Sequence, residues 1–331
     1  KQANGIYFTP PNTVKRNIEL LQPYLDNITT VLEPSCGSGE YITQLKTNNN
    51  LAITGVEINE KIFESIQPLE DTNLRLINSD FLGMDFSESY DLIIGNPPYF
   101  VMKKGDVDES YYDYFDGRPN IFILFIIKSL GLLNSDGILS FILPKSFLNC
   151  LYYDNTRRYI NQHFTILDIV ECTDKYIDTQ QGTIILMIQN KAPVDTNNRF
   201  TIIRSPYTIF STSEALDKLK QLYENSTTLK NMGFSACIGN VTWNQHKSCL
   251  TTDESKTLLV YSSDIKNNKL EIQKYRNDKK KNYINKSGTS DPVLVINRGY
   301  GNGKYKLNYA IINENDDKEY LVENHLICIK Y

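Results

Sequence analysis

The four residues Asn96-Pro97-Pro98-Tyr99 combine groups that could hold a planar amine. They follow an apolar run, Asp91–Gly95, which predicts a buried strand that ends in a rigid turn. Because proline has no N–H group, the turn offers a bare carbonyl oxygen beside the Asn96 amide oxygen. Two acceptors and an aromatic ring suit an –NH2 group on a flat ring. The chemistry that this predicts is alkyl transfer to a weakly nucleophilic planar amine, such as adenine N6.

The flanking sequence predicts a parallel α/β sheet with this turn at its carboxyl edge. Short apolar runs alternate with helical patterns between residues 30 and 145, which is typical of such a sheet. The expected strands are Thr30–Glu33, Ile53–Glu57, Leu74–Ile77, Asp91–Gly95 and Gly137–Leu143, and the expected helices are Val14–Leu25, Ile121–Leu133 and Tyr153–His163. Two later runs, Ile166–Val170 and Thr183–Ile188, are expected as an antiparallel pair that closes the sheet edge.

Length and composition allow two globular domains. The chain has 331 residues, of which 40% are hydrophobic and 22% charged, as is ordinary for a soluble protein. The segment Lys191–Asn198 loses its periodicity and is rich in turn residues, so it is the expected linker. We therefore expect a Rossmann-like sheet in residues 1–195 and a smaller α+β domain in residues 196–331, with a helix at Ser213–Tyr223.

The loop Glu33–Gly39 follows the first expected strand and favours a cofactor without phosphates. Its Gly-x-Gly pair lets a ligand approach the backbone, but it lacks the third glycine of a dinucleotide loop and the Lys-Ser/Thr of a phosphate loop. Glu57 ends the second strand, 24 residues after Glu33, where an acid can hold ribose hydroxyls. Asp80 and Phe81 follow the third strand and offer a carboxylate and a ring to an adenine. S-adenosylmethionine fits this set.

These motifs resemble, in their order, those of the gamma-class DNA adenine-N6 methyltransferases, the Taq-type family. The resemblance is carried by Gly5–Pro10, Glu33–Gly39, Glu57, Asp80-Phe81 and Asn96–Tyr99, and it runs from residue 5 to about residue 190. It implies an S-adenosylmethionine-dependent methyltransferase that modifies adenine N6 at specific sites in double-stranded DNA, within a restriction–modification or epigenetic system.

The resemblance also implies roles for individual residues. Thr9 would help to hold the methionine carboxylate, and Ile58 and Phe81 would pack on the cofactor adenine. The residues assigned to the cofactor are Thr9, Glu33, Ser35, Cys36, Gly37, Gly39, Glu57, Ile58, Asp80, Phe81 and Asn96. Asn96 and the Pro97 carbonyl would bind the target amine, and Tyr99 would stack on the flipped base. Pro98, Phe100 and Asn120 are expected on the DNA side of the site.

One position departs from the family pattern. The family often has an aromatic residue directly after the strand Thr183–Ile188, opposite the tyrosine, and this chain has Gln189-Asn190 there. The rings of the Gly105–Pro119 loop could replace it, or they could only pack that loop. These rings belong to Tyr111, Tyr112, Tyr114 and Phe115.

The C-terminal part of the chain has the charge and the loops of a DNA-reading region. From Asn240 onward there are 15 Lys and Arg against 11 Asp and Glu, whereas residues 1–239 carry a net charge of −8. Two loops, Gly239–Lys247 and Arg298–Lys306, collect amides, rings and cations. Arg and Asn can read base edges and Lys suits phosphates, although two ordinary surface hairpins would look the same. The candidate DNA contacts are Trp243, Asn244, Lys247, Arg298 and Lys304.

Other classes of site have little support in the sequence. Six scattered cysteines and three histidines predict a reduced cytoplasmic protein without a metal site or a His-based catalytic apparatus. The longest apolar stretch, Asn120–Leu133, is interrupted by Lys128 and Ser129 and is too short to cross a membrane. We expect a monomer that associates with the nucleoid through its DNA substrate and works alongside a cognate restriction endonuclease.

Two alternatives remain open from the sequence. The Asn-Pro-Pro-Tyr turn also serves enzymes that methylate glutamine in release factors and relatives that act on ribosomal guanine, because both acceptors are planar amines. The second alternative is a catalytically silent DNA-binding module on a methyltransferase fold.

Overall fold

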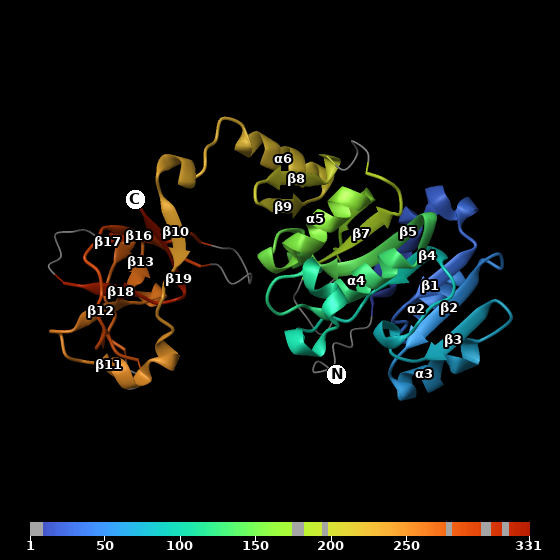
Figure 1. Cartoon of the computed structure of the whole chain (residues 1–331), viewed down its shortest axis with the longest axis horizontal. Coiled ribbons are helices and arrows are strands. Elements are labelled where there is room, and N and C mark those ends of the chain that lie inside the picture. The colour runs from blue at the N-terminus through green and yellow to red at the C-terminus, as the bar shows by residue number, and fades with distance from the viewer. Residues whose placement is uncertain (1–8, 174–181, 194–197, 276–279, 299–305, 313–317) are drawn as a thin grey trace. The chain divides into compact units, whose positions relative to one another are not determined.

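The chain folds into two compact units, residues 1–224 and residues 225–331 (Figure 1). The computed structural model describes residues 9–173, 182–193, 198–275, 280–298, 306–312 and 318–331. Each unit has its own buried clusters of apolar side chains, so each is described by itself.

Unit 1 is built on a seven-stranded sheet with the order β3-β2-β1-β4-β5-β7-β6 (Figure 1). Its strands are β1 Thr30–Glu33, β2 Ala52–Glu57, β3 Leu74–Asn78, β4 Tyr90–Gly95, β5 Leu133–Pro144, β6 Thr165–Glu171 and β7 Thr183–Gln189. The first five strands are parallel, and β7 lies antiparallel between β5 and β6. The predicted α/β sheet and its antiparallel closing pair are therefore confirmed.

Helices cover both faces of this sheet because residues on each strand alternate between the faces. The helices are α1 Pro11–Leu20, α2 Glu40–Leu45, α3 Glu60–Ile66, α4 Ile121–Gly131, α5 Asp154–His163 and α6 Ser213–Tyr223. Side chains of α1, α2 and α3 share one cluster with Val31 and Leu92, whereas α4 and α5 share the other with Leu32 and Ile93. The first helix ends earlier than expected, because Pro23 lies in a 3₁₀ segment, Gln22–Asn27, that follows it.

Unit 1 extends past the boundary that the sequence predicted at residues 195 and 196. A hairpin of β8 Thr201–Arg204 and β9 Tyr207–Phe210, together with α6, belongs to it. The reason is packing, since Phe200 and Phe210 are buried in the cluster that contains α4 and α5. The predicted linker Lys191–Asn198 is therefore a connection inside unit 1, and its residues 194–197 lie outside the described residues.

Unit 2 consists of strands and 3₁₀ turns. The strands are β10 Ser235–Ile238, β11 Leu250–Thr251, β12 Thr257–Val260, β13 Ile265–Lys266, β14 Lys269–Leu270, β15 Tyr283–Ile284, β16 Val293–Asn297, β17 Tyr309–Ile312, β18 Tyr320–Val322 and β19 Leu326–Lys330. They form two four-stranded sheets, β10-β19-β16-β17 and β11-β15-β12-β18, and the pair β13-β14. The part of this unit that the structure describes contains no α-helix, so the helix expected in an α+β second domain is α6 of unit 1.

None of the helices in the described ranges has both the length and the apolar character needed to cross a bilayer.

Arg157 of α5 fastens the β8–β9 hairpin to the rest of unit 1. The side chain is 1% exposed, and its guanidinium donates to Thr208 O at 2.6 Å and to Phe147 O at 2.8 Å. It also pairs with buried Asp154 at 3.2 Å, and Asp154 in turn accepts from Thr208 N at 2.8 Å. Burial lowers the pKa of Arg157, and Asp154 opposes that effect.

Replacing Arg157 should destabilise unit 1 strongly, because the carbonyl groups of Phe147, Cys150 and Thr208 would lose their donor and buried Asp154 would lose one of its partners. We expect Arg157→Met to lower the free energy of unfolding by about 3–5 kcal/mol, measured by urea denaturation. Arg158→Met is the matched control, because Arg158 pairs with the same carboxylate but is 46% exposed. Equal losses in the two variants would contradict this account.

Candidate active site

The candidate site lies where the order of the parallel strands reverses, between β1 and β4. Open α/β sheets bind ligands at the carboxyl ends of their strands at such a point. The strands pair in parallel through Val31 with Leu92 and Leu32 with Ile93. The loops that follow them are also joined, since Ser35 Oγ donates to the Asn96 carbonyl at 3.2 Å.

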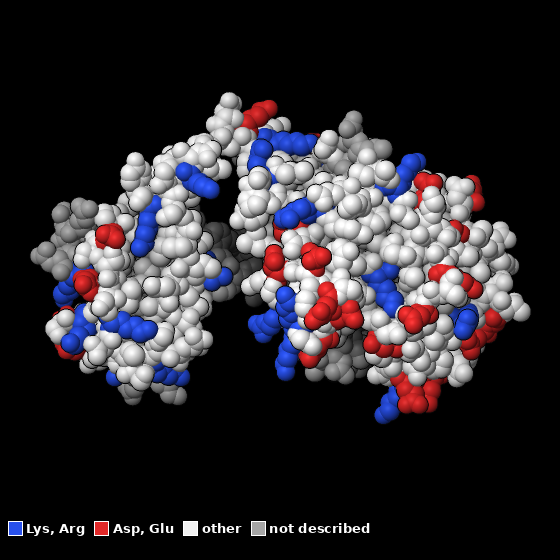
Figure 2. Space-filling view, in the orientation of Figure 1, with Lys and Arg blue, Asp and Glu red and all other residues white. Residues whose placement is uncertain are grey.

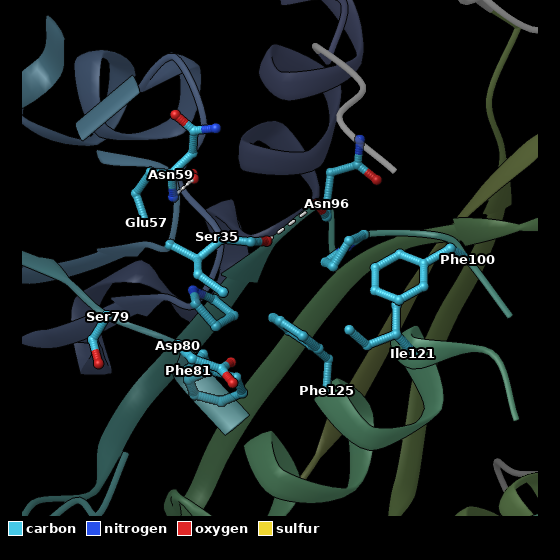
Figure 3. Close-up of a pocket in the computed structure, with 13 residues that line it drawn as sticks. Ser35, Glu57, Asn59, Ser79, Asp80, Phe81, Asn96, Phe100, Ile121 and Phe125 are labelled. Carbon is cyan, nitrogen blue, oxygen red and sulfur yellow. Dashed lines mark hydrogen bonds between the residues drawn. The ribbon is translucent and has the colours of Figure 1, made fainter. Parts of the chain in front are cut away.

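A cavity of about 510 Å³ opens at this edge of the sheet (Figure 3). Its walls come from the loops after β1, β2, β3 and β4 and from the start of α4. The lining residues are Pro34, Ser35, Glu57, Ile58, Asn59, Ser79, Asp80, Phe81, Asn96, Pro98, Phe100, Ile121 and Phe125. The cavity therefore brings together six of the residues that the sequence assigned to the cofactor. It also contains Pro98 and Phe100, which were expected on the DNA side.

Glu57 is held in a fixed position at one wall of the cavity. Its carboxylate accepts from Gly37 N at 2.9 Å and from Asn59 N at 2.8 Å. Gly37 has a φ of +50° and Gly39 has a φ of +80°, a region that favours glycine, so the predicted Gly-x-Gly pair shapes this loop. A carboxylate has about four lone-pair sites, so Glu57 can still accept from ligand hydroxyls.

Phe81 forms an apolar wall that α4 supports. The ring is 2% exposed and lies 5.0 Å from the ring of Phe125, centroid to centroid. Lys128 of α4 donates to Leu82 O at 2.9 Å and to Met84 O, and its ammonium lies 5.3 Å from the Phe81 centroid. Burial lowers the pKa of Lys128. These contacts hold the loop that carries both Phe81 and Asp80.

The cavity fits the adenosine part of S-adenosylmethionine. Ile58 is 67% exposed although it is apolar, so it is an uncovered surface for a flat ring. Phe81 gives a second apolar surface, and the carboxylates of Asp80 and Glu57 can accept from an amino group and from ribose hydroxyls. The phosphates of a dinucleotide would be repelled by the carboxylates of Glu57 and Asp80, which accept hydrogen bonds and cannot donate them when ionised.

Glu33 and Cys36 belong to the cofactor loop but do not line the cavity. Both are 2% exposed, and Glu33 Oε2 has no hydrogen-bond partner among the described residues. Burial, reinforced by Glu40 and Glu57, raises the pKa of Glu33 well above its ordinary value. Burial, with Glu33 and Glu57, also raises the pKa of the Cys36 thiol. Their buried side chains anchor the loop in the protein interior.

The Asn96–Tyr99 turn has the Asn96 amide at its centre. Asn96 Nδ2 donates to Thr9 Oγ1 at 3.1 Å, and Asn96 Oδ1 accepts from the Tyr99 hydroxyl at 2.5 Å. The same hydroxyl also lies within hydrogen-bond distance of Ile142 O, at 2.7 Å, and the Tyr99 ring makes a T-shaped contact with Phe122 at 5.9 Å. Asn96 lines the cavity and the Tyr99 side chain does not, although the two are joined by the hydrogen bond at Asn96 Oδ1. Residues 5–8 of the predicted N-terminal motif lie outside the described residues.

The expectation about Gln189 and Asn190 is wrong. Because β7 runs antiparallel to β5, Gln189 pairs with Ile138 at the start of β5, at the opposite edge of the sheet from the cavity. Asn190 Nδ2 donates to the carbonyls of Leu133 and Asn134 at that edge. A ring at these positions could not face Tyr99.

The rings of the 105–119 loop pack against the apolar cluster that contains α4. Phe115 is 2% exposed, and Tyr111, Tyr112 and Tyr114 contact the same cluster. This arrangement favours the interpretation that these rings pack the loop. Asn120 lies outside the cavity lining, and its Oδ1 is buried without a hydrogen-bond partner among the described residues.

Sequence reasoning missed several residues of the cavity. These are Pro34, Asn59, Ser79, Ile121 and Phe125. The signal for the last two was present, because they lie four residues apart on one side of the predicted helix. The continuous apolar run of α4 hid them, since every residue in it looks like core. Asn59 caps α3 by accepting from Lys61 N and Ile62 N.

The two candidate DNA loops of unit 2 meet at one turn. Arg298 Nη1 donates to Asn324 O at 2.9 Å, and Arg298 N donates to His325 O at 3.2 Å. Val241 of the other loop contacts the same turn, because its carbonyl oxygen accepts from Asn324 N at 2.9 Å. Gly239 must be glycine here, because a Cβ would lie 2.3 Å from Glu323 O. The turn 322–325 is thus part of this surface, although no pattern in the sequence points to it.

The remaining residues of these loops differ in exposure. Asn244 and Lys247 are exposed, whereas Trp243 packs against a buried cluster and has the Lys247 ammonium 5.9 Å from its ring. Lys304 lies outside the described residues. Figure 2 shows many Asp and Glu side chains on the visible face of unit 1, whereas the charged side chains on that of unit 2 are mainly Lys and Arg.

The burial of Cys36 predicts a protected thiol. Because the thiolate is the reactive form and the pKa of Cys36 is raised, we expect iodoacetamide at pH 8 to modify Cys36 at least about tenfold more slowly than exposed Cys237. Peptide mass spectrometry after timed labelling gives both rates. Equal labelling of the two cysteines would contradict the burial of Cys36.

Comparison with known proteins gives a consistent result. Residues 16–177 match the family described as Eco57I restriction-modification methylase. The type II methyltransferase M.CvrRI of Paramecium bursaria Chlorella virus XZ-6E is 27% identical, over 99% of this chain and 83% of its own. The modification methylase CviBIII of Paramecium bursaria Chlorella virus NC1A is 28% identical, over 100% of this chain and 83% of its own.

A solved structure shares the fold. The protein, described as a class I S-adenosylmethionine-dependent methyltransferase from Listeria monocytogenes, is 19% identical with a TM-score of 0.50, covering 57% of this chain and 62% of its own. The predicted Rossmann-like fold class is confirmed, and it is the fold of a protein described as S-adenosylmethionine-dependent. The part of the chain that carries the cavity, residues 16–177, is therefore similar in sequence to the Eco57I restriction-modification methylases and has the fold of S-adenosylmethionine-dependent methyltransferases.

Proposed function

We propose that this protein is a type II DNA methyltransferase that acts on N6 of an adenine flipped out of double-stranded DNA. The observation that carries the proposal is the position of Asn96, at the edge of a cavity that fits adenosine and beside Tyr99. The names of the relatives, a type II methyltransferase and a modification methylase, support the reaction class. The choice of adenine N6 rests on the chemistry of the Asn96–Tyr99 turn.

The cavity residues would hold S-adenosylmethionine through its adenosine. Glu57 would accept from the ribose hydroxyls, and Asp80 from the adenine amino group. Ile58 and Phe81 would lie against the adenine faces, with Pro98 and Phe125 completing the apolar wall. Thr9, which contacts Asn96, would lie near the methionine part. The bound cofactor supplies an activated methyl group on a positively charged sulfur.

Asn96 and Pro97 would prepare the target amine by accepting both of its hydrogens. The amine of adenine is flat because its lone pair is shared with the ring. Two acceptors outside the ring plane favour the pyramidal form, in which the lone pair points away from both acceptors. Positioning and fixed dipoles then supply the catalytic effect, and no strong base is needed. This agrees with the lining of the cavity, which contains no histidine.

The target base has to leave the duplex to reach this turn. Flipping costs a few kcal/mol, and stacking on an aromatic ring returns about 1–3 kcal/mol. The Tyr99 ring, which meets Phe122 in a T-shaped contact at 5.9 Å, would provide that surface.

Unit 2 would select the DNA sequence. Its net positive charge suits the phosphate backbone, and the loops that meet at residues 322–325 present Arg298, Asn244 and Lys247 together with His325. We further propose that the protein acts as a monomer on DNA in the cytoplasm, in association with the nucleoid, and that a restriction endonuclease of the same specificity is its partner.

Asn96→Ala should abolish methyl transfer while cofactor binding survives. We expect at least about a 100-fold loss of rate, because a preorganised acceptor at the reacting amine is removed. Transfer of tritiated methyl groups to DNA measures the rate, and calorimetry with S-adenosylhomocysteine measures binding. Exposed Asn50, remote from the cavity, gives the control Asn50→Ala. Unchanged turnover in Asn96→Ala would refute the assignment.

Arg298→Ala should weaken DNA binding or relax site preference. We expect the binding free energy, or its difference between cognate and altered sites, to change by about 1–3 kcal/mol, as for loss of a base contact. Fluorescence anisotropy with cognate and altered duplexes, once the modified sites are mapped, separates the two effects. Lys256→Ala removes an equal charge from an exposed position and should leave site preference unchanged. Native selectivity in Arg298→Ala would remove this loop from the reading surface.

A further inference from the structure

The Tyr99 hydroxyl faces two acceptors and has one proton to share between them. It lies 2.5 Å from Asn96 Oδ1 and 2.7 Å from Ile142 O. Ile142 belongs to β5 and is fully buried, one residue beyond Phe141, which is the last β5 partner of β4. A phenolic hydroxyl donates one hydrogen bond at a time along its O–H direction. The proton can therefore turn between the Asn96 amide and a carbonyl of the sheet.

Three hydroxyl groups hold Asn96 in place. Ser35 Oγ donates to its carbonyl oxygen at 3.2 Å, and Thr9 Oγ1 accepts from its Nδ2 at 3.1 Å. The Tyr99 hydroxyl is the contact at the other end of the amide, Oδ1. An asparagine amide has an acceptor at one end and a donor at the other, so its rotation decides which of the two a target amine meets.

We propose that the Tyr99 hydroxyl positions the Asn96 amide. The hydroxyl donates to Asn96 Oδ1 until the amine of the target base arrives and donates there instead. Tyr99 is then a positioning residue through its hydroxyl, in addition to any stacking by its ring. When the target amine donates to Asn96 Oδ1, the Tyr99 proton turns to Ile142 O, so neither the hydroxyl nor the amide loses a partner. No covalent bond changes in this step. The role rests on the proposed function of Asn96.

The structure separates the hydroxyl from the ring. The ring packs edge-on against Phe122 and contacts the apolar cluster of α4, and Tyr99→Phe would retain both contacts. Without the hydroxyl, the contacts among the described residues hold the amide only at its nitrogen end, through Thr9. Its oxygen would then spend less time in the orientation that the amine needs.

The test compares Tyr99→Phe with Tyr90→Phe. Tyr90 begins β4, at the end of the strand away from the Asn96–Tyr99 turn, and its side chain forms a hydrogen bond with Thr54. Since Tyr90 is buried, the control also removes a buried hydroxyl from unit 1. We expect the single-turnover rate of Tyr99→Phe, with DNA and S-adenosylmethionine saturating, to fall about 3- to 10-fold, as for one lost hydrogen bond. The KM values for DNA and cofactor should stay within about twofold. Tyr90→Phe should keep the native rate.

A second readout does not depend on activity. The Asn96 side-chain NH2 signals, assigned by their loss in Asn96→Asp, should show faster motion by ¹⁵N relaxation in Tyr99→Phe and native motion in Tyr90→Phe. An unchanged rate, or an amide as ordered as in the native protein, would overturn the proposal. If the native protein does not methylate DNA, the proposed function fails, and the relaxation data still decide whether the hydroxyl holds the amide.

Discussion

The parallel pairing of β1 with β4 is the constraint on which the site depends. It places the ends of two strands that are far apart in sequence side by side, at the point where the strand order reverses. The contact between Ser35 and the Asn96 carbonyl then joins the cofactor loop to the turn that carries the acceptor chemistry. Neither loop could form the cavity alone, because Glu57 and Asp80 supply its polar wall and α4 supplies its apolar wall.

The elements that position the site were predictable because their signals are local. Alternating apolar runs gave the five parallel strands, and the Gly-x-Gly loop and the acids at strand ends gave most of the polar wall. The end of α1 was not predictable from periodicity, since Ile18, Leu21 and Leu25 continue a helical pattern into a segment that Pro23 turns into 3₁₀ conformation. Local backbone chemistry outweighed the apolar spacing there.

The features that sequence reasoning missed depend on contacts between distant residues. Arg157 reaches a carbonyl 51 residues away, and this contact, together with the burial of Phe200 and Phe210, keeps β8–β9 in the first unit, past the apparent linker. Gln189 lies at the edge of the sheet opposite the cavity because β7 runs antiparallel to β5. The order of apolar runs in the sequence does not show which strand of the closing pair is antiparallel to β5. The sequence predicted only a stacking role for the ring of Tyr99. Its hydroxyl contacts with Asn96 and Ile142 require the register of β5 against β4, which only the folded chain supplies.

In the proposed function, the amine held at Asn96 is adenine N6 in DNA. The most direct measurement is mass spectrometry of the nucleosides obtained from unmethylated DNA after incubation with this protein and S-adenosylmethionine. The account predicts N6-methyldeoxyadenosine, with no gain of methylated deoxycytidine. Methylation confined to cytosine, or transfer to protein or RNA with none to DNA, would contradict it.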